Sequence, residues 1–132
     1  MKHKIYLNMK YKLIERANPQ DRTKVKLYAS PINDGKITQN DIGKDIVLNS
    51  SLSRGDIMNV VTNLLDTMPK YLLMGKSVSL GEFGTLRLSF TSEGVDTADQ
   101  FNPNLITGVK IVFTPGVELK KSLDSISFEK SE

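Results

Sequence analysis

The longest regular pattern of apolar residues in the chain lies between Ser53 and Gly75. Its apolar positions recur at intervals of three and four residues, which places them on one stripe of a helix about 100° wide. Ser53 is a typical N-cap, and Asp56 places negative charge in the first turn, where the helix dipole favours it. Pro69 removes a backbone hydrogen bond, so we expect a kink or a break near residues 66–68 before Gly75 ends the helix. The stripe consists of Ile57, Val60, Val61, Leu64, Leu65, Met68 and Leu72.

Two strands are predicted after this helix, on either side of a glycine-flanked phenylalanine. Residues 78–80 and 86–90 alternate between apolar and polar types, which is the period of a strand. Between them lies GEFG, residues 81–84, where glycine occupies two of four positions. This spacing predicts a bulge or a close approach between two backbones.

The N-terminal part of the chain also alternates. Residues 4–14 place apolar side chains on one face and mainly basic side chains on the other, and residues 24–30 alternate again. The sequence NPQD at residues 18–21 is typical of a turn. We therefore expect a β-hairpin or two paired strands in the first thirty residues, followed by a turn or linker at residues 31–36.

Shorter elements complete an α+β prediction. A short helix begins at Thr38 or Asn40 and ends at residues 49–51, so it forms a helical hairpin with the long helix. After residue 90 the chain turns polar, with turn signals at residues 93–94 and 102–104. A returning strand at residues 109–114, a short helix at 117–123 and a small closing strand at 127–130 follow.

Composition excludes several classes of protein. The chain of 132 residues has room for one compact domain with an extension, and it contains no cysteine, which excludes disulfides and thiolate metal sites. It has no apolar run of signal-peptide length and no run of eighteen apolar residues, so neither secretion by a standard signal nor a membrane partner is expected. A cytoplasmic protein is the simplest interpretation.

Charge is distributed unevenly along the chain. The net charge is +3, but residues 1–37 carry nine Lys or Arg against three Asp or Glu, a balance of +6. Residues 38–132 carry nine against twelve, a balance of −3. The positive field therefore comes from the N-terminal segment.

No catalytic constellation is visible in the sequence. The only histidine, His3, lies in the basic leader, and the pairs Asp41 with Asp45 and Asp96 with Asp99 occur in polar contexts typical of a solvated surface. GEFG lacks the glycine spacing and the following Lys-Ser/Thr of a phosphate loop. We expect no enzyme, no cofactor, no metal and no small-molecule substrate.

Two blocks of sequence, taken together, resemble the HU and integration host factor family of bacterial DNA-binding proteins. The first is VSLGEFGTL, residues 78–86, and the second is FTPGVELK, residues 113–120. The resemblance covers about residues 37–126 and points to a divergent HU-like branch with an N-terminal extension. It implies a 1–36 extension and an HU-like domain at 37–132, in which helical hairpins of two subunits interlock as a homodimer. A dimer also agrees with the small core that one chain can build, although the apolar stripe alone is compatible with a monomer core.

The resemblance also implies a set of phosphate contacts on the body and two β-arms that enter the minor groove of duplex DNA. The family usually has basic residues on either side of its Pro-Gly, where this chain has Thr114 and Val117, so two charges are missing. The candidate contact residues of the body are Arg54, Lys76, Arg87, Lys110, Lys120 and Lys121.

The arm departs from the family pattern. Asn102 and Pro103 resemble the arm tip with its intercalating proline, yet residues 88–107 contain three acids and no Lys or Arg. Only a short strand fits between Gly108 and Pro115, which is too little for an arm strand of family length. Pro103 is therefore either a wedge between bases or an ordinary loop proline.

Lysines of the N-terminal strands could compensate for the acidic arm by following phosphates without reading sequence. The alternative is a solvated face whose lysines protect a sheet edge from aggregation. The main hypothesis is a homodimer that binds double-stranded DNA with little sequence specificity and shapes the chromosome in the cytoplasmic nucleoid. The alternative hypothesis is a protein-interaction or structural module with weak or no DNA binding. The basic positions are Lys2, Lys4, Lys10, Lys12, Arg16, Lys24 and Lys26, of which Lys10, Lys12, Lys24 and Lys26 are the chosen candidates for DNA contact.

Overall fold

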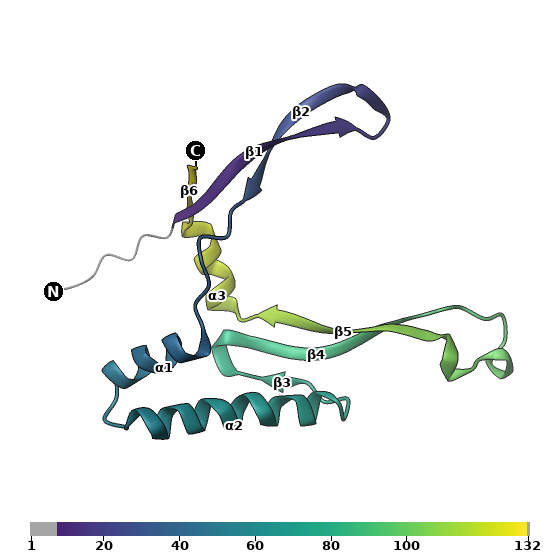
Figure 1. Cartoon of the computed structure of the whole chain (residues 1–132). Helices are drawn as coiled ribbons and strands as arrows, with labels where there is room; N and C mark the ends of the chain where they lie inside the picture. Colours follow the sequence, from purple (N-terminus) through teal and green to yellow (C-terminus); the bar gives the residue numbers. More distant parts are fainter. Residues whose placement is uncertain (1–7, 132) are drawn as a thin grey trace. The chain divides into compact units, whose positions relative to one another are not determined.

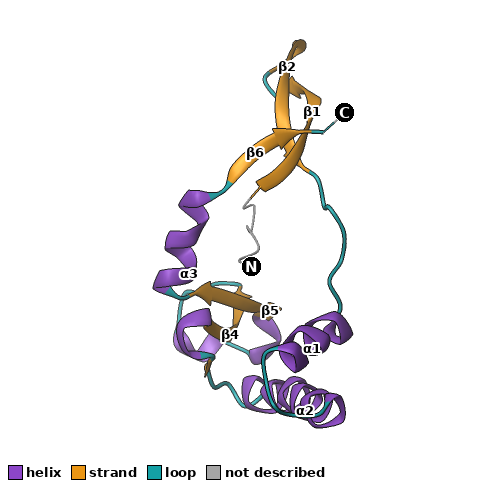
Figure 2. Ribbon diagram, turned by 90° about the vertical axis from the view of Figure 1, so that its left-hand side faces the viewer, coloured by secondary structure: helices purple, strands orange, loops and turns teal. Residues whose placement is uncertain are grey.

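The computed structural model describes residues 8–131 and is α+β, as the sequence predicts (Figures 1 and 2). The chain forms two compact units. The central unit contains residues 38–120, and the terminal unit combines residues 1–37 with residues 121–132. The sequence predicts a boundary after residue 36, between an extension and an HU-like domain. That domain division stays a prediction.

The central unit begins with the predicted helical hairpin. Helix α1 (Gln39–Leu48) starts at a capping box: the Thr38 hydroxyl accepts from the Asp41 backbone N–H, and the Asp41 carboxylate accepts from the Thr38 backbone N–H at 2.9 Å. Helix α2 (Arg54–Leu72) starts at Ser53, whose hydroxyl accepts from the backbone N–H of Asp56 at 3.2 Å. Both starts are those that the sequence indicates.

Helix α2 continues through Pro69 to Leu72, so of the two alternatives expected near residues 66–68 the break is wrong, and the kink stays a prediction. Pro69 lies in the last turn, where the loss of one backbone donor affects few helical bonds. The carbonyl of Pro69 accepts from Leu73 at 2.9 Å, and the carbonyl of Leu72 accepts from Gly75 at 2.9 Å. Gly75 then leaves the helix with φ +80°.

An antiparallel sheet in the order β3-β4-β5 completes the central unit. Its strands are β3 (Val78–Ser79), β4 (Gly84–Ser92) and β5 (Ile106–Pro115). β5 is longer than expected, so the sequence argument for a short returning strand is wrong. Gly108 adopts φ +64° where the register shifts between Ser89 and Thr91, and this bulge lets pairing continue to Ser92 and Ile106.

The two sequence blocks of the HU resemblance contact each other in this unit. The backbone N–H of Gly116 donates to the carbonyl of Phe83 at 3.0 Å, and the rings of Phe83 and Phe113 lie 5.2 Å apart. A Cβ on Gly116 would collide with the carbonyl of Glu82, and one on Gly84 would lie 2.5 Å from the carbonyl oxygen of Thr114. The close approach predicted for GEFG is confirmed, and it explains why both blocks need glycine.

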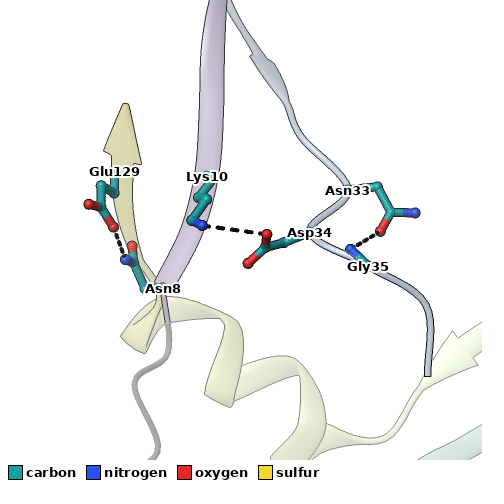
Figure 3. Close-up of polar contacts among 6 residues, drawn as sticks. All are labelled: Asn8, Lys10, Asn33, Asp34, Gly35 and Glu129. Atoms are coloured by element: carbon teal, nitrogen blue, oxygen red, sulfur yellow. Dashed lines mark hydrogen bonds and ion pairs between the residues drawn. The ribbon is translucent and has the colours of Figure 1, made fainter. Parts of the chain in front are cut away.

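The terminal unit is a second sheet, in the order β2-β1-β6. β1 (Asn8–Asn18) and β2 (Asp21–Pro31) form the predicted hairpin around Pro19 and Gln20, and residues 4–7 of the predicted first strand lie outside the described residues. β6 (Ser127–Lys130) pairs with β1 in parallel. The Asn8 side-chain amide donates to the Glu129 carboxylate at 2.7 Å across this pair (Figure 3).

The core of the described chain is small. Among residues 8–131, Ile57 and Leu72 are the buried apolar side chains, with 3% and 6% of their surface exposed. Much of the α1 and α2 stripe stays accessible, including Ile42, Val60 and Leu64 at 48%, 62% and 47%. None of the helices seen between residues 8 and 131 has the length and apolarity that a bilayer crossing requires.

Candidate nucleic-acid interface

The register of the β1–β2 hairpin gathers most of its basic side chains on one face. Lys12 lies opposite Ser30, and Arg16 lies opposite Lys26, on one face of the sheet. The pairs on the other face include Leu13 with Ala29 and Ala17 with Val25. We call the first the basic face, and it carries Lys10, Lys12, Ile14, Arg16, Lys24, Lys26 and Tyr28.

The charges of the basic face are largely uncompensated. Lys10 forms an ion pair with Asp34, at 3.4 Å between Nζ and Oδ1 (Figure 3). That pair is exposed, so it contributes little to stability and leaves Lys10 able to exchange partners. Among residues 8 to 131, Lys12, Arg16, Lys24 and Lys26 form no ion pair. The four candidates Lys10, Lys12, Lys24 and Lys26 are thus brought to one face, as the alternation predicts.

The cationic candidates of the central unit are more scattered. Arg54 and Lys76 flank the two ends of α2, so about 30 Å of helix separates them within one chain. Arg87 and Lys110 share a face of the β4–β5 pair, because Arg87 lies opposite Val112 and Lys110 lies opposite Ser89.

Helix α3 (Val117–Ser122) carries the other two candidate cations, Lys120 and Lys121. Neighbouring positions on a helix project about 100° apart. Lys120 and Lys121 therefore do not both point toward one flat surface.

The arm tip is acidic and locally satisfied. Asn102 accepts from the backbone N–H of Asn104 at 2.9 Å, and Pro103 starts a short 3₁₀ turn that ends at Leu105. The Thr97 hydroxyl lowers the pKa of the Asp99 carboxyl, which favours its charged form. These contacts account for Asn102 and Pro103 as turn residues, and the negative charge opposes an approach to phosphate.

Sequence reasoning left Tyr28 out of the candidate site. The Arg16 guanidinium lies over its ring, 5.7 Å from the centroid, which is a cation–π geometry. The signal was present, because Lys24, Lys26 and Tyr28 recur at every second residue and so share a face. Between residues 8 and 131, no group of three or more His, Cys, Asp or Glu side chains is arranged to hold a metal ion.

Comparison with known proteins places the chain in a family. Residues 7–130 match the family described as "HU domain fused to wHTH, Ig, or Glycine-rich motif", HU-HIG. The chain belongs to the HU-HIG family. The match covers both units of this HU-HIG chain, including the N-terminal hairpin that the HU resemblance in the sequence does not reach. No curated protein matches the chain.

A solved structure shares the fold. It is the crystal structure of a candidate bacterial DNA-binding protein from Bacteroides vulgatus ATCC 8482, with a TM-score of 0.62 and 14% sequence identity. The similarity covers 93% of the HU-HIG chain and 47% of the other protein, so the chain spans about half the length of that relative. At this identity the likeness concerns the fold.

Proposed function

We propose that this HU-HIG chain binds double-stranded DNA with little sequence preference and contributes to chromosome architecture in the nucleoid. The observation that carries the proposal is the basic face of the β1–β2 hairpin, where exposed Lys12, Arg16, Lys24 and Lys26 lie together. Cations spaced along a sheet can follow phosphates without contacting base edges, which gives affinity without sequence readout. Arg87 and Lys110 on the β4–β5 pair are proposed as further phosphate contacts.

The proposal includes a homodimer formed through the helical hairpin. One chain leaves Leu64 and Leu65 of α2 at 47% and 44% exposed, although both lie on the apolar stripe. Burial of such side chains between two copies is favourable by about 25 cal/mol for each Å² of apolar surface removed from water. A second copy of the same stripe supplies the complementary apolar surface.

Fluorescence anisotropy with a labelled random duplex of about 24 base pairs, titrated at several salt concentrations, tests the DNA contact. The intact chain is expected to bind with an affinity that falls steeply as salt rises. Replacing Lys10, Lys12, Lys24 and Lys26 with Gln is expected to weaken binding and to lower the slope of log affinity against log salt by up to about 0.9 for each lost phosphate contact.

The matched control replaces Lys36, Lys44, Lys70 and Lys130 with Gln, which removes the same charge from outside the basic face. If DNA binds through the basic face, the control variant loses much less affinity for the duplex than the test variant does. Equal losses would mean that net charge alone drives binding, and no binding by the intact chain at low salt would reject the proposed function.

A protein-interaction module is the second candidate function. The β4–β5 arm exposes Phe90, Val109 and Ile111 at 57%, 65% and 64%, on the face opposite Arg87 and Lys110. Together with the acidic tip, this apolar face suits a protein surface better than phosphates. Failure of the intact chain to bind duplex at low salt, with the fold intact by circular dichroism, would favour this second function.

A further inference from the structure

The turn end of the β1–β2 hairpin encloses a recess that the sequence does not reveal. Its cavity has a volume of about 420 Å³ and is lined by Arg16, Asn18, Pro19, Lys24, Lys26 and Tyr28. Three of these six residues are cations and none is an acid. The recess lies entirely within the terminal unit, so its geometry does not depend on the central unit.

An irregularity in the hairpin creates the recess. Ala17 pairs with Val25, but the next residue of β1, Asn18, pairs with Asp21. Residues 22–24 of β2 therefore have no partner opposite them, and the strand bulges at this point. The turn is fixed by Asn18, whose Oδ1 accepts from the Gln20 backbone N–H at 2.9 Å, and by Asp21, whose Oδ1 accepts from that of Thr23 at 3.1 Å. Lys24, at the end of this unpaired segment, lines the same recess as Arg16 and Lys26.

The recess concentrates like charge in a way that costs stability when nothing is bound. Arg16 lies directly opposite Lys26, and like charges in a cross-strand pair repel. Neither of them, nor Lys24, forms an ion pair with any residue from 8 to 131. The Arg16 guanidinium is held instead over the Tyr28 ring. An anion in the recess would relieve the repulsion by accepting charge-assisted hydrogen bonds from these side chains.

We propose that this recess is a phosphate-binding pocket that takes one backbone phosphate of a nucleic-acid strand. Arg16, Lys24 and Lys26 supply cationic donors, and the Nδ2 of Asn18 can also donate because its Oδ1 is the atom held in the turn. The volume equals that of about fourteen water molecules at about 30 Å³ each, which is more than a phosphate alone fills. The Tyr28 ring provides an apolar wall for the attached sugar.

The pocket deepens the proposed DNA binding and rests on it for the identity of the ligand. It differs from a diffuse basic face in one measurable respect. Cations in a recess act together on a single phosphate, whereas on the rest of the face Lys12 is a separate exposed charge and Lys10 is already paired with Asp34. Removing two charges from the pocket should therefore cost more affinity than removing two from the rest of the face.

The test compares two double variants of the full chain in the duplex anisotropy assay. Arg16→Gln with Lys26→Gln is expected to weaken binding about tenfold more than Lys10→Gln with Lys12→Gln, which removes the same charge from the same face. Arg16→Lys keeps the charge but loses the planar fork over Tyr28, so an intermediate loss is expected. Equal losses in the two double variants would overturn the pocket while leaving DNA binding intact.

A second measurement identifies the ligand without depending on duplex binding. The Arg16 Nε–H resonance is followed by NMR while the full chain is titrated with a thymidine dinucleotide, which holds a single phosphodiester, or with inorganic phosphate. A saturating shift with the dinucleotide that is lost in Lys26→Gln supports the proposal, even if the proposed duplex binding fails. A shift with inorganic phosphate alone would overturn the assignment to a nucleic-acid strand, and no shift with either would overturn the pocket.

Discussion

Gly116 occupies a position where a side chain has no room. Its α-carbon faces the backbone of Glu82, and its N–H donates to the carbonyl of Phe83 at 3.0 Å. The contact joins the end of β5 to the turn before β4, so it fixes the base of the arm. A backbone neighbour cannot move aside as a flexible side chain can.

Gly116→Ala is therefore expected to lower the free energy of unfolding by at least about 1–3 kcal/mol, the range for overpacking a close contact. Urea unfolding followed by circular dichroism measures it. Gly94→Ala is the control, because a Cβ at Gly94 meets nothing within 4 Å. An unchanged midpoint for Gly116→Ala would show that the turn at Glu82 yields at little cost.

The carboxyl of Asp41 links stability to pH. The backbone N–H of Thr38, and then its hydroxyl, donate to this carboxylate and lower its pKa below the ordinary value of 3.8. A lowered folded-state pKa means that the stabilisation is fully present above pH 3.8 and is lost as pH falls through the folded value.

Asp41→Asn should therefore lower the urea midpoint at neutral pH, and the gap from the unsubstituted protein should close as pH falls below 3.8. The control is Asp45→Asn, which removes the same charge from α1 but away from the capping box. A difference in urea midpoint that persists unchanged in strong acid would show that the charge of Asp41 does not account for the stability that the cap contributes.

At the scale of elements, helix α2 is incomplete on its own. It buries Ile57 and Leu72, yet Leu64 in the middle of the same stripe is 47% exposed. A helix in a protein gains most of its stability from burial of its apolar face, and this is the reason for proposing a second copy along the centre of α2.

Leu64→Asp should raise the dissociation constant of the proposed homodimer at least about 100-fold, because an unpaired buried carboxylate costs several kcal/mol and each 1.4 kcal/mol is about tenfold. Sedimentation velocity over a range of concentrations reports the change. Asn63→Asp adds the same charge one position away on the exposed face and should leave the dimer intact. A dimeric Leu64→Asp protein would contradict the proposed interface.

Local signals explain which elements the sequence could predict. Thr38 and Ser53 cap their helices through residues three positions away, so the sequence contains both halves of each cap. The recess lies at a register shift between β1 and β2. That shift is set by the pairing of the two strands around the turn and not by a local sequence signal. The sequence left open whether Pro69 kinks α2 or breaks it, and the helix continues because tertiary context overrides the cost of one lost bond.

The partner of β6 was beyond sequence reasoning for a different reason. Residues 127–130 contain a correct signal for a short strand, but four residues carry no information about which strand they pair with. In the structure they add to β1 in parallel, and Ser131 donates to the carbonyl of Tyr11 at 2.8 Å. The candidate cations and Tyr28 were predictable because they follow strand period, whereas their grouping with Arg16 and Asn18 of β1 in one recess required the fold.

At the scale of the whole molecule, the terminal unit joins segments from both ends of the described chain. A chain that stops at Ser125 lacks β6 and should lose hydrogen-exchange protection at residues 8–11 by about tenfold or more, since an edge strand frays more readily. Amide exchange read by NMR or mass spectrometry measures this, and the amides of α2 serve as an internal control. Unchanged protection at residues 8–11 would show that β6 contributes nothing to the sheet.

The parallel pairing of β1 with β6 also sets an order of events during synthesis. Asn8 and Glu129 are 121 positions apart, so at about 5–20 residues per second the ribosome adds the second about 6–24 s after the first. During that interval the nascent hairpin has an open edge along β1, and the last residue of the central unit, Lys120, is added only nine positions before Glu129. On a polysome, the β6 strand of a neighbouring nascent chain could fill that edge first, so the rate of elongation would govern how many molecules leave the ribosome strand-exchanged.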